Sequence, residues 1–281
     1  MKTGVIVQAR TSSTRLPEKV LLELPYGSGI KVLTQVIRRL KKATLVDEII
    51  IATTTDKEDQ KIVDVAVQEK VLSFRGSKED VLERYYLAAK ENELDHIVRI
   101  TSDCPCIDPI LIDHCIQEHL KENADYTSTS LQHKYSHGLD VEVMKFTALE
   151  KAYKEAKENF EKEHVTIFIY RSHPDLFKIH AIHAPEEYRD SSIRVTLDTK
   201  EDYTLLCAVY DYMYNKNPYF GVKEIFELFK AKPWLRNINN TVLQKKVFNT
   251  LEEEAKEAIK ILKLQDLNRV EAFIQKRIFD K

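Results

Sequence analysis

The chain has 281 residues, enough for one large domain or for one domain with an appendage. Charged residues make up 31% of it, yet the net charge is only −2, which argues against a general binder of nucleic acids or membrane surfaces. The four cysteines show no disulfide framework or paired CxxC spacing, and no segment is apolar for long enough to span a bilayer. We therefore expect a cytoplasmic protein with reduced thiols and no membrane or nucleic-acid partner.

The first half of the chain alternates between strand and helix patterns. Residues 3–9 form an apolar run typical of a buried strand, and apolar residues at helical spacing predict a helix at 31–42. Strands are then expected at 47–54, 71–76 and 95–103, with helices at 57–70, 78–92 and 109–123. This alternation indicates parallel strands joined by right-handed crossovers. The expected fold class is α/β, with a doubly wound and mostly parallel sheet.

The pattern changes near residue 125. Two short strands around a polar loop are expected between 125 and 144, and a mostly helical segment at 146–170. Residues 193–213 return to a strand, a turn and a helix. After residue 240 no strand is expected and apolar residues recur about every seven positions. We expect a domain of residues 1–239 and a C-terminal helical extension of residues 240–281 that packs on the body or on a second subunit.

The loop after the first strand, ARTSSTRLPEK at 9–19, combines cations with hydroxyl groups. In a doubly wound sheet this loop lies at the carboxyl edge, where backbone N–H groups and a helix N-terminus face a ligand. Arg10, Arg15 and Lys19 would add three positive charges there, and residues 11–14 four hydroxyl donors. The loop is neither a Walker-type loop nor a GxGxxG turn. A phosphate-binding loop and an ordinary solvated loop both remain open.

Two aspartates that follow predicted strands are candidate metal ligands. Asp103 ends the strand expected at 95–103, and Asp198 ends the strand expected at 193–198. Mg²⁺ prefers one or two carboxylates together with phosphate oxygens and water, so this pair could hold it beside a triphosphate. For Asp198 an ordinary turn aspartate is the alternative.

Other polar residues near these aspartates have simpler interpretations. Cys104 and Cys106 raise the question of zinc, but a lone CxC without a second pair argues against it, and Cys104 is expected to fill space in the core. Glu201 and Asp202 fit the first turn of the following helix. We expect them to cap that helix rather than to bind a ligand.

Six segments occur in the order and spacing typical of one enzyme family: VIVQARTSSTRLPEKVL, FRGSKEDVLERYYLAA, RITSDCPCIDP, GLDVEV, EHVT and RVTLDTKED. Through them residues 3–210 resemble the cytidylyltransferases of the spore coat polysaccharide biosynthesis type, relatives of the acylneuraminate and 3-deoxy-manno-octulosonate cytidylyltransferases. The resemblance implies a nucleotide-diphospho-sugar transferase-like fold, CTP as donor, Mg²⁺ as cofactor and a homodimer. It predicts transfer of CMP from CTP to an acidic or phosphorylated sugar, with release of pyrophosphate, for surface polysaccharide or glycan biosynthesis.

The resemblance also implies roles for individual residues. It assigns the phosphates of CTP to the first loop, the base to the end of the first strand and to the turn after the third, the metal to the two aspartates, and the acceptor to the second half of the chain. The nucleotide-binding residues are Gln8, Ala9, Arg10, Ser12, Ser13, Arg15, Lys19, Arg75 and Gly76; the metal ligands are Asp103 and Asp198; the acceptor-binding residues are Gly138, Asp140, Glu142 and His164. Catalysis is expected from Arg15, Lys19, Asp103 and Asp198. No covalent nucleophile is needed, because positioning and electrostatics dominate such transfers.

The chain also departs from the family pattern. Relatives commonly carry glycine where this chain has Ser12 and Glu18, and glycine permits close backbone approach and positive φ. Asp140 and Glu142 could instead form the polar face of a strand, and His164 could be structural. Two other functions remain open: a nucleotide-sugar-dependent glycosyltransferase of similar fold, and a catalytically weak nucleotide-binding partner protein.

Overall fold

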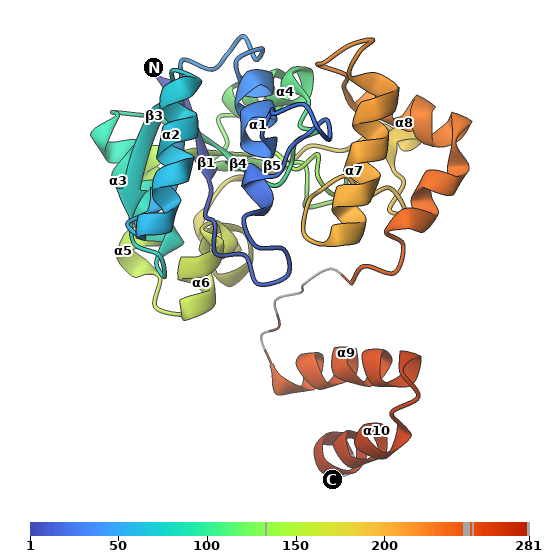
Figure 1. Cartoon of the computed structure of the whole chain (residues 1–281). Helices are drawn as coiled ribbons and strands as arrows, with labels where there is room; N and C mark the ends of the chain where they lie inside the picture. The colour runs from blue at the N-terminus through green and yellow to red at the C-terminus, as the bar shows by residue number, and fades with distance from the viewer. Residues whose placement is uncertain (133, 244–247, 249, 280–281) are drawn as a thin grey trace. The chain divides into compact units, whose positions relative to one another are not determined.

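The computed structural model describes residues 1–132, 134–243, 248 and 250–279. It divides into two compact units, Met1–Val242 and Leu243–Lys281. The first unit contains a seven-stranded sheet with helices on both faces (Figure 1). No helix in the described part of the chain is both long and apolar enough to cross a membrane.

The strands are β1 (Thr3–Gln8), β2 (Glu48–Thr54), β3 (Leu72–Gly76), β4 (His96–Thr101), β5 (Tyr126–Ser128), β6 (Glu142–Lys145) and β7 (Ile179–Ala181). The α-helices are α1 (Val32–Leu40), α2 (Gln60–Gln68), α3 (Val81–Glu91), α4 (Pro109–Lys121), α5 (Phe146–Glu155), α6 (Asn159–His164), α7 (Lys200–Met213), α8 (Val222–Ala231), α9 (Leu251–Leu264) and α10 (Asn268–Ile274). Short 3-10 and π turns connect them, including Lys19–Leu21 and Pro233–Ile238.

The strand order is β3-β2-β1-β4-β6-β5-β7, and β3, β2, β1 and β4 run parallel. This confirms the predicted α/β class with a mostly parallel sheet. The order reverses between β1 and β4, which makes their carboxyl ends the switch point where such sheets bind ligands. Gln8, the last residue of β1, is level with Thr101, the last residue of β4. The loops that follow the two strands therefore start side by side.

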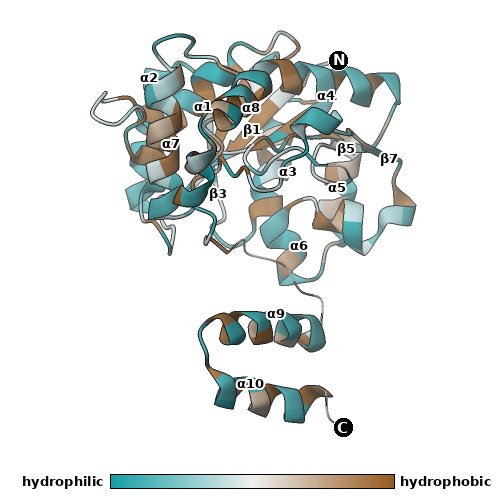
Figure 2. Cartoon of the chain, turned by 90° about the vertical axis from the view of Figure 1, so that its right-hand side faces the viewer, coloured by the Kyte–Doolittle hydropathy of each residue, from teal (hydrophilic) through white to brown (hydrophobic). Residues whose placement is uncertain are grey.

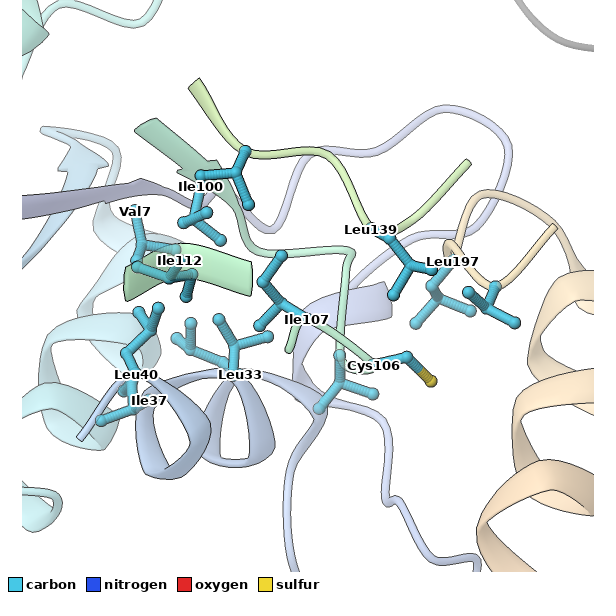
Figure 3. Close-up of a cluster of buried hydrophobic side chains, with 14 of the residues drawn as sticks. Val7, Leu33, Ile37, Leu40, Ile100, Cys106, Ile107, Ile112, Leu139 and Leu197 are labelled. Atoms are coloured by element: carbon cyan, nitrogen blue, oxygen red, sulfur yellow. The ribbon is translucent and has the colours of Figure 1, made fainter. Parts of the chain in front are cut away.

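Alternating residues of β1 enter two separate cores. Val5 and Val7 pack with helices α1 and α4, whereas Ile6 packs with α3 and α5 on the other face. Figure 3 shows the first of these cores, in which Val7 and Ile100 lie over Leu33 and Ile37 of α1. Because both faces of the central strands are covered, these strands are hydrophobic along their length, as Figure 2 shows for β1.

The second half of the sheet differs from the expectation in two places. The segment expected to be a strand at 193–198 forms only a single bridge, between Arg194 and His137. Its amides bond to two separate segments, since Val195 N donates to His137 O and Leu197 N donates to Asp103 O, both at 2.8 Å. Instead β7 joins the edge of the sheet, parallel to β5. A strand of only three residues is too short to show an alternation of apolar and polar side chains from which it could be predicted.

The second unit is a pair of helices, α9 and α10, that contact each other. The Thr250 hydroxyl caps α9 by accepting a hydrogen bond from Glu253 N at 3.2 Å. Apolar and polar residues alternate in bands along both helices (Figure 2). Ala255 is the buried apolar residue of the described part of this unit, and Leu251, Leu264 and Phe273 are exposed.

Candidate functional site at the switch point of the sheet

The loop after β1 is folded around the buried carboxylate of Asp59. Thr11 donates to Asp59 Oδ1 from both its amide (2.8 Å) and its hydroxyl (2.7 Å), and Thr54 donates to Asp59 Oδ2. Burial alone would raise the pKa of Asp59, but these hydrogen bonds hold it below its usual value. The Thr11 hydroxyl, expected to be a ligand donor, is therefore used to shape the loop.

Glu18 occupies a left-handed position in this loop, with φ of 53° and ψ of 22°. Its carboxylate lies 2.6 Å from Lys61 Nζ on α2 and is exposed. The conformation explains why glycine suits this position. Because Glu18 pairs with Lys61, its negative charge does not join the carboxylates that surround Lys19.

Lys19 lies between the two predicted metal aspartates. Its Nζ is 2.7 Å from Asp103 Oδ2 and 2.8 Å from Asp198 Oδ1, and its side chain is only 12% exposed. Arg15 Nη2 lies 3.0 Å from Asp198 Oδ2. The structure thus brings Arg15, Lys19, Asp103 and Asp198 into one cluster at the switch point, although 179 residues separate Lys19 from Asp198.

A third cation completes this cluster. Arg194 Nη2 donates to Asp198 Oδ2 at 2.8 Å, and the same guanidinium binds both oxygens of the fully buried Asp202 at 2.9 and 3.0 Å. Asp202 forms the expected capping box with Thr199 and has this second role as well. Sequence reasoning missed Arg194, because only the structure shows that its guanidinium group contacts two carboxylates.

The cations and acids of the cluster stabilise each other's charged forms. Burial alone would raise the pKa of Asp198, but Lys19, Arg15 and Arg194 hold it well below its usual range. Burial alone would lower the pKa of Lys19, but Asp103 and Asp198 raise it above its usual value. Lys19 and Asp198 are therefore both ionised at neutral pH. A fixed array of positive charge beside two carboxylates can hold a metal–triphosphate complex.

The remaining predicted nucleotide residues lie along the same edge. Gln8 and Ala9 tie β1 to its neighbours through their backbone, since Ala9 N donates to Ala52 O and Gln8 O accepts from Ser102 N. Ser12 is exposed and Ser13 half-buried, and neither hydroxyl bonds to another residue of the described chain. Arg10 is exposed, and its charge acts on Lys78 and on Arg84.

Arg75 and Gly76 end β3, two strands away from β1. The Arg75 guanidinium is occupied by Thr54 O (3.0 Å), Asp56 O (2.7 Å) and Gln60 Oε1 (2.9 Å), so it supports the loop after β2. A Cβ on Gly76 would come within 2.9 Å of the Phe74 ring. Strands lie about 5 Å apart, so a ligand reaching from β3 to β1 would span about 10 Å.

Arg84 on α3 is a buried cation that the sequence did not single out. It is 2% exposed, its Nη1 donates to Ser77 O at 3.2 Å, and its Nε has no partner in the described part of the chain. Burial lowers its pKa. Since its Cγ lies 3.2 Å from the Cβ position of Gly76, an unsatisfied donor stands beside the end of β3.

The predicted acceptor residues form two ion pairs near the start of β6. Asp140 Oδ2 lies 3.1 Å from His137 Nδ1 and accepts a hydrogen bond from Gly138 N at 2.9 Å. Glu142 Oε2 lies 2.8 Å from Arg99 Nη1, across the β4–β6 pairing. These contacts make Asp140 and Glu142 paired groups rather than a solvated strand face.

Gly138 and His164 frame these pairs. Gly138 has φ of 104°, and a Cβ there would lie 2.5 Å from the carbonyl carbon of Val195, so only glycine fits. His164, at the end of α6, is half-buried, and burial together with the Arg99 charge lowers its pKa, against the nearby carboxylates. It is therefore neutral at pH 7.

The donor set of the cluster suits a hard cation that shares its ligands with phosphate. The described residues contain no group of three or more His, Cys, Asp or Glu placed to hold a metal ion. Mg²⁺ takes one or two carboxylates from proteins at phosphate sites, and Asp103 and Asp198 would fit that requirement. Cys104 and Cys106 are buried, and burial raises the pKa of both thiols, so they are inert core residues rather than zinc ligands.

Comparison with known proteins identifies the family. Residues 4–281 match the family model described as cytidylyltransferase. The chain belongs to the cytidylyltransferase family. It is 34% identical to the spore coat polysaccharide biosynthesis protein SpsF of Bacillus subtilis, over 81% of this chain and 94% of that protein. It is 42% identical to an uncharacterized protein of Methanocaldococcus jannaschii, over 87% of this chain and 97% of that protein.

Solved structures agree with this family. A cytidylyltransferase from Leptospira borgpetersenii superposes with a TM-score of 0.78 at 32% identity, covering 87% of this chain and all of that one. A CMP:2-keto-3-deoxy-manno-octonic acid synthetase complexed with CTP superposes over 77% of this chain with a TM-score of 0.55; at 14% identity it shows the shared fold. The family favours a cytidylyltransferase over the glycosyltransferase alternative.

Proposed function

We propose that the chain transfers CMP from CTP to an acidic or phosphorylated sugar and releases pyrophosphate, for polysaccharide or glycan biosynthesis. The single observation that carries the proposal is the convergence of Lys19 with Asp103 and Asp198 at the switch point of the sheet. Membership of the family supports the use of CTP, and the relative SpsF supports the biosynthetic context.

On this proposal the triphosphate lies against the first loop. Arg15 and Lys19 would bind the phosphates that leave as pyrophosphate. The exposed Arg10 and the hydroxyls of Ser12 and Ser13, which have no partner among the described residues, would add further donors. Asp103 and Asp198 would hold a Mg²⁺ ion, which would neutralise charge on the phosphate oxygens. The acceptor oxygen attacks the α-phosphorus in line, and the bond from that phosphorus to the β-phosphate oxygen breaks.

The cytosine would lie toward the end of β3. A nucleoside would extend from the end of β1, at Gln8 and Ala9, to the end of β3, at Arg75 and Gly76. The acceptor sugar would lie on the other side of the phosphates, near Gly138, Asp140, Glu142 and His164.

A pyrophosphate-release screen tests the proposal. Four nucleoside triphosphates are each combined with a panel of acidic and phosphorylated sugars. We expect release with CTP, Mg²⁺ and one acceptor class. Release with another nucleotide would contradict the donor assignment. Stabilisation by CTP without release across the panel would favour the catalytically weak nucleotide-binding partner protein.

We also propose that the protein forms a homodimer, as the family resemblance implies. Sedimentation analysis of the full chain across a concentration series tests this. A single species with the mass of one 32.8 kDa chain at all concentrations would contradict it.

A further inference from the structure

Lys19 takes the carboxylate oxygens that a metal would need. Its ammonium occupies Asp103 Oδ2 and Asp198 Oδ1, and Arg15 and Arg194 both occupy Asp198 Oδ2. Asp103 Oδ1 faces only the Cys104 thiol at 3.7 Å among the described residues. A divalent cation held by Asp103 and Asp198 would compete with the Lys19 ammonium for these carboxylate oxygens.

The charges of the cluster already balance. Three carboxylates (Asp103, Asp198 and Asp202) face three cations (Arg15, Lys19 and Arg194). A metal ion entering alone would add two positive charges and leave a largely buried ammonium without its carboxylates. Separating a buried cation from its partners is costly, so the metal-free pairing opposes binding of the metal alone.

A triphosphate reverses this balance. When Lys19 moves away from the two aspartates, its ammonium can pair with the negatively charged phosphates instead. Lys19 is suited to move, because a lysine is a point charge with three donors on a flexible stem. Arg194 is less able to move, since Asp202 grips it through two hydrogen bonds and Asn239 bonds to both Arg194 O and Asp202.

We propose that Lys19 is an internal competitor for the metal site, so that metal and triphosphate bind cooperatively and a divalent cation binds weakly in the absence of nucleotide. The proposal rests on the proposed function for its assignment of the metal to Asp103 and Asp198. Linkage makes the effect reciprocal: the factor by which CTP tightens metal binding equals the factor by which the metal tightens CTP binding.

Binding of Mn²⁺, followed by the EPR signal of the free ion, tests the proposal on the full chain. In the absence of CTP we expect Lys19→Met to bind Mn²⁺ about tenfold more tightly than the wild type. CTP should then improve Mn²⁺ affinity less in Lys19→Met than in the wild type. A second exchange, Lys19→Gln, guards against a folding defect of the methionine variant, and thermal melts of both verify the fold.

Matched controls separate local competition from net charge. Lys61→Met also removes one lysine charge next to this loop, where Lys61 pairs with Glu18, and should leave Mn²⁺ affinity unchanged. The double variant Lys19→Met with Asp198→Asn should lose the gain, which places the metal at these carboxylates. If both folded Lys19 variants bind Mn²⁺ no more tightly than the wild type, or not at all, Lys19 is not a competitor. Failure of the proposed function is seen separately, as absence of pyrophosphate release from CTP by the wild type.

Discussion

Asp202 accepts a hydrogen bond from the backbone amide of Asp198 at 2.9 Å and so ties Asp198 to the first turn of α7. The same carboxylate binds the guanidinium of Arg194, which also donates to Asp198. Replacing Asp202 with alanine leaves the buried Arg194 without its main partner. We expect Asp202→Ala to lower the free energy of unfolding by about 3–5 kcal/mol, measured by urea titration. Glu201→Ala, in the same turn but exposed, should change it by less than about 0.5 kcal/mol.

Loss of the Asp103 carboxylate should affect turnover far more than folding. We expect Asp103→Asn to reduce pyrophosphate release from CTP by about 100- to 1,000-fold, comparable to removal of one preorganised electrostatic partner. The measurement is initial rate at saturating CTP, Mg²⁺ and acceptor. Asp211→Asn on the exposed face of α7 is the control and should leave the rate unchanged. A rate within a few-fold of wild type in Asp103→Asn would remove this residue from the metal site.

Gly138 is required by both its backbone conformation and its surroundings. Gly138→Ala should lower the free energy of unfolding by about 3 kcal/mol or more, because the added Cβ meets the backbone of Val195 and Thr196. Gly29 also has a positive φ, of 72°, but no atom within 4 Å of its Cβ position. Gly29→Ala should therefore cost only the backbone strain, about 1–2 kcal/mol. Equal losses in the two variants would show that the close contact with Val195 is unimportant.

The buried His119 should make the free energy of unfolding fall at acid pH. It is fully buried on α4, and its Nε2 lies 3.1 Å from His96 Nδ1. Burial, with added repulsion from His96, lowers the pKa of His119 to about 3. The unfolded chain therefore binds more protons between pH 3 and about 6.5, so stability falls as the pH drops below about 6.5, by at most about 1.4 kcal/mol per pH unit for this group.

Urea titrations at pH 7.5 and 5.5 measure this effect. We expect the wild type to be less stable at pH 5.5 by about 1 kcal/mol or more, since burial also lowers the pKa of His96. His119→Gln should reduce the difference between the two pH values. His114→Gln, on the exposed side of α4, should preserve it. The assignment is wrong if His119→Gln retains the full pH dependence.

Glu18 allows a direct comparison of backbone strain with an ion pair. Both Glu18→Gly and Glu18→Ala remove the contact with Lys61, but only glycine relieves the left-handed conformation. We expect the glycine variant to be more stable than the alanine variant by about 0.5–1 kcal/mol. Pyrophosphate release should stay within about twofold of wild type in both. A much lower rate in Glu18→Gly would mean that Glu18 itself contributes to the site.

The parallel half of the fold was predictable from the sequence because β1 and β4 are buried on both faces and are followed by long helices. The meeting of Lys19 with Asp103 could be anticipated as well, since both follow neighbouring parallel strands. Their roles remain predictions. Asp198 was harder to place, because the segment before it forms one bridge instead of a strand.

Other features depend on partners that no local pattern reveals. Asp59 shapes the first loop from 48 residues away. Arg194 lies only four and eight residues before Asp198 and Asp202, but the irregular backbone between them gives no periodicity from which their contact could be predicted. Arg84 appears in the sequence as one more charged residue of an amphipathic helix. Only packing shows that its guanidinium is enclosed.

The reversed direction of β6 has a consequence for how this enzyme can diversify. Because β6 runs antiparallel to β4, Glu142 begins its strand at the same edge where β1 and β4 end. The connection between Ser128 and Glu142 therefore reaches the same edge as the loops after β1 and β4, and its His137 and Gly138 pack on the segment that leads to Asp198. On the proposed arrangement, changes in this connection that spare His137 and Gly138 would alter the preference for the sugar while the cluster around Lys19 is kept.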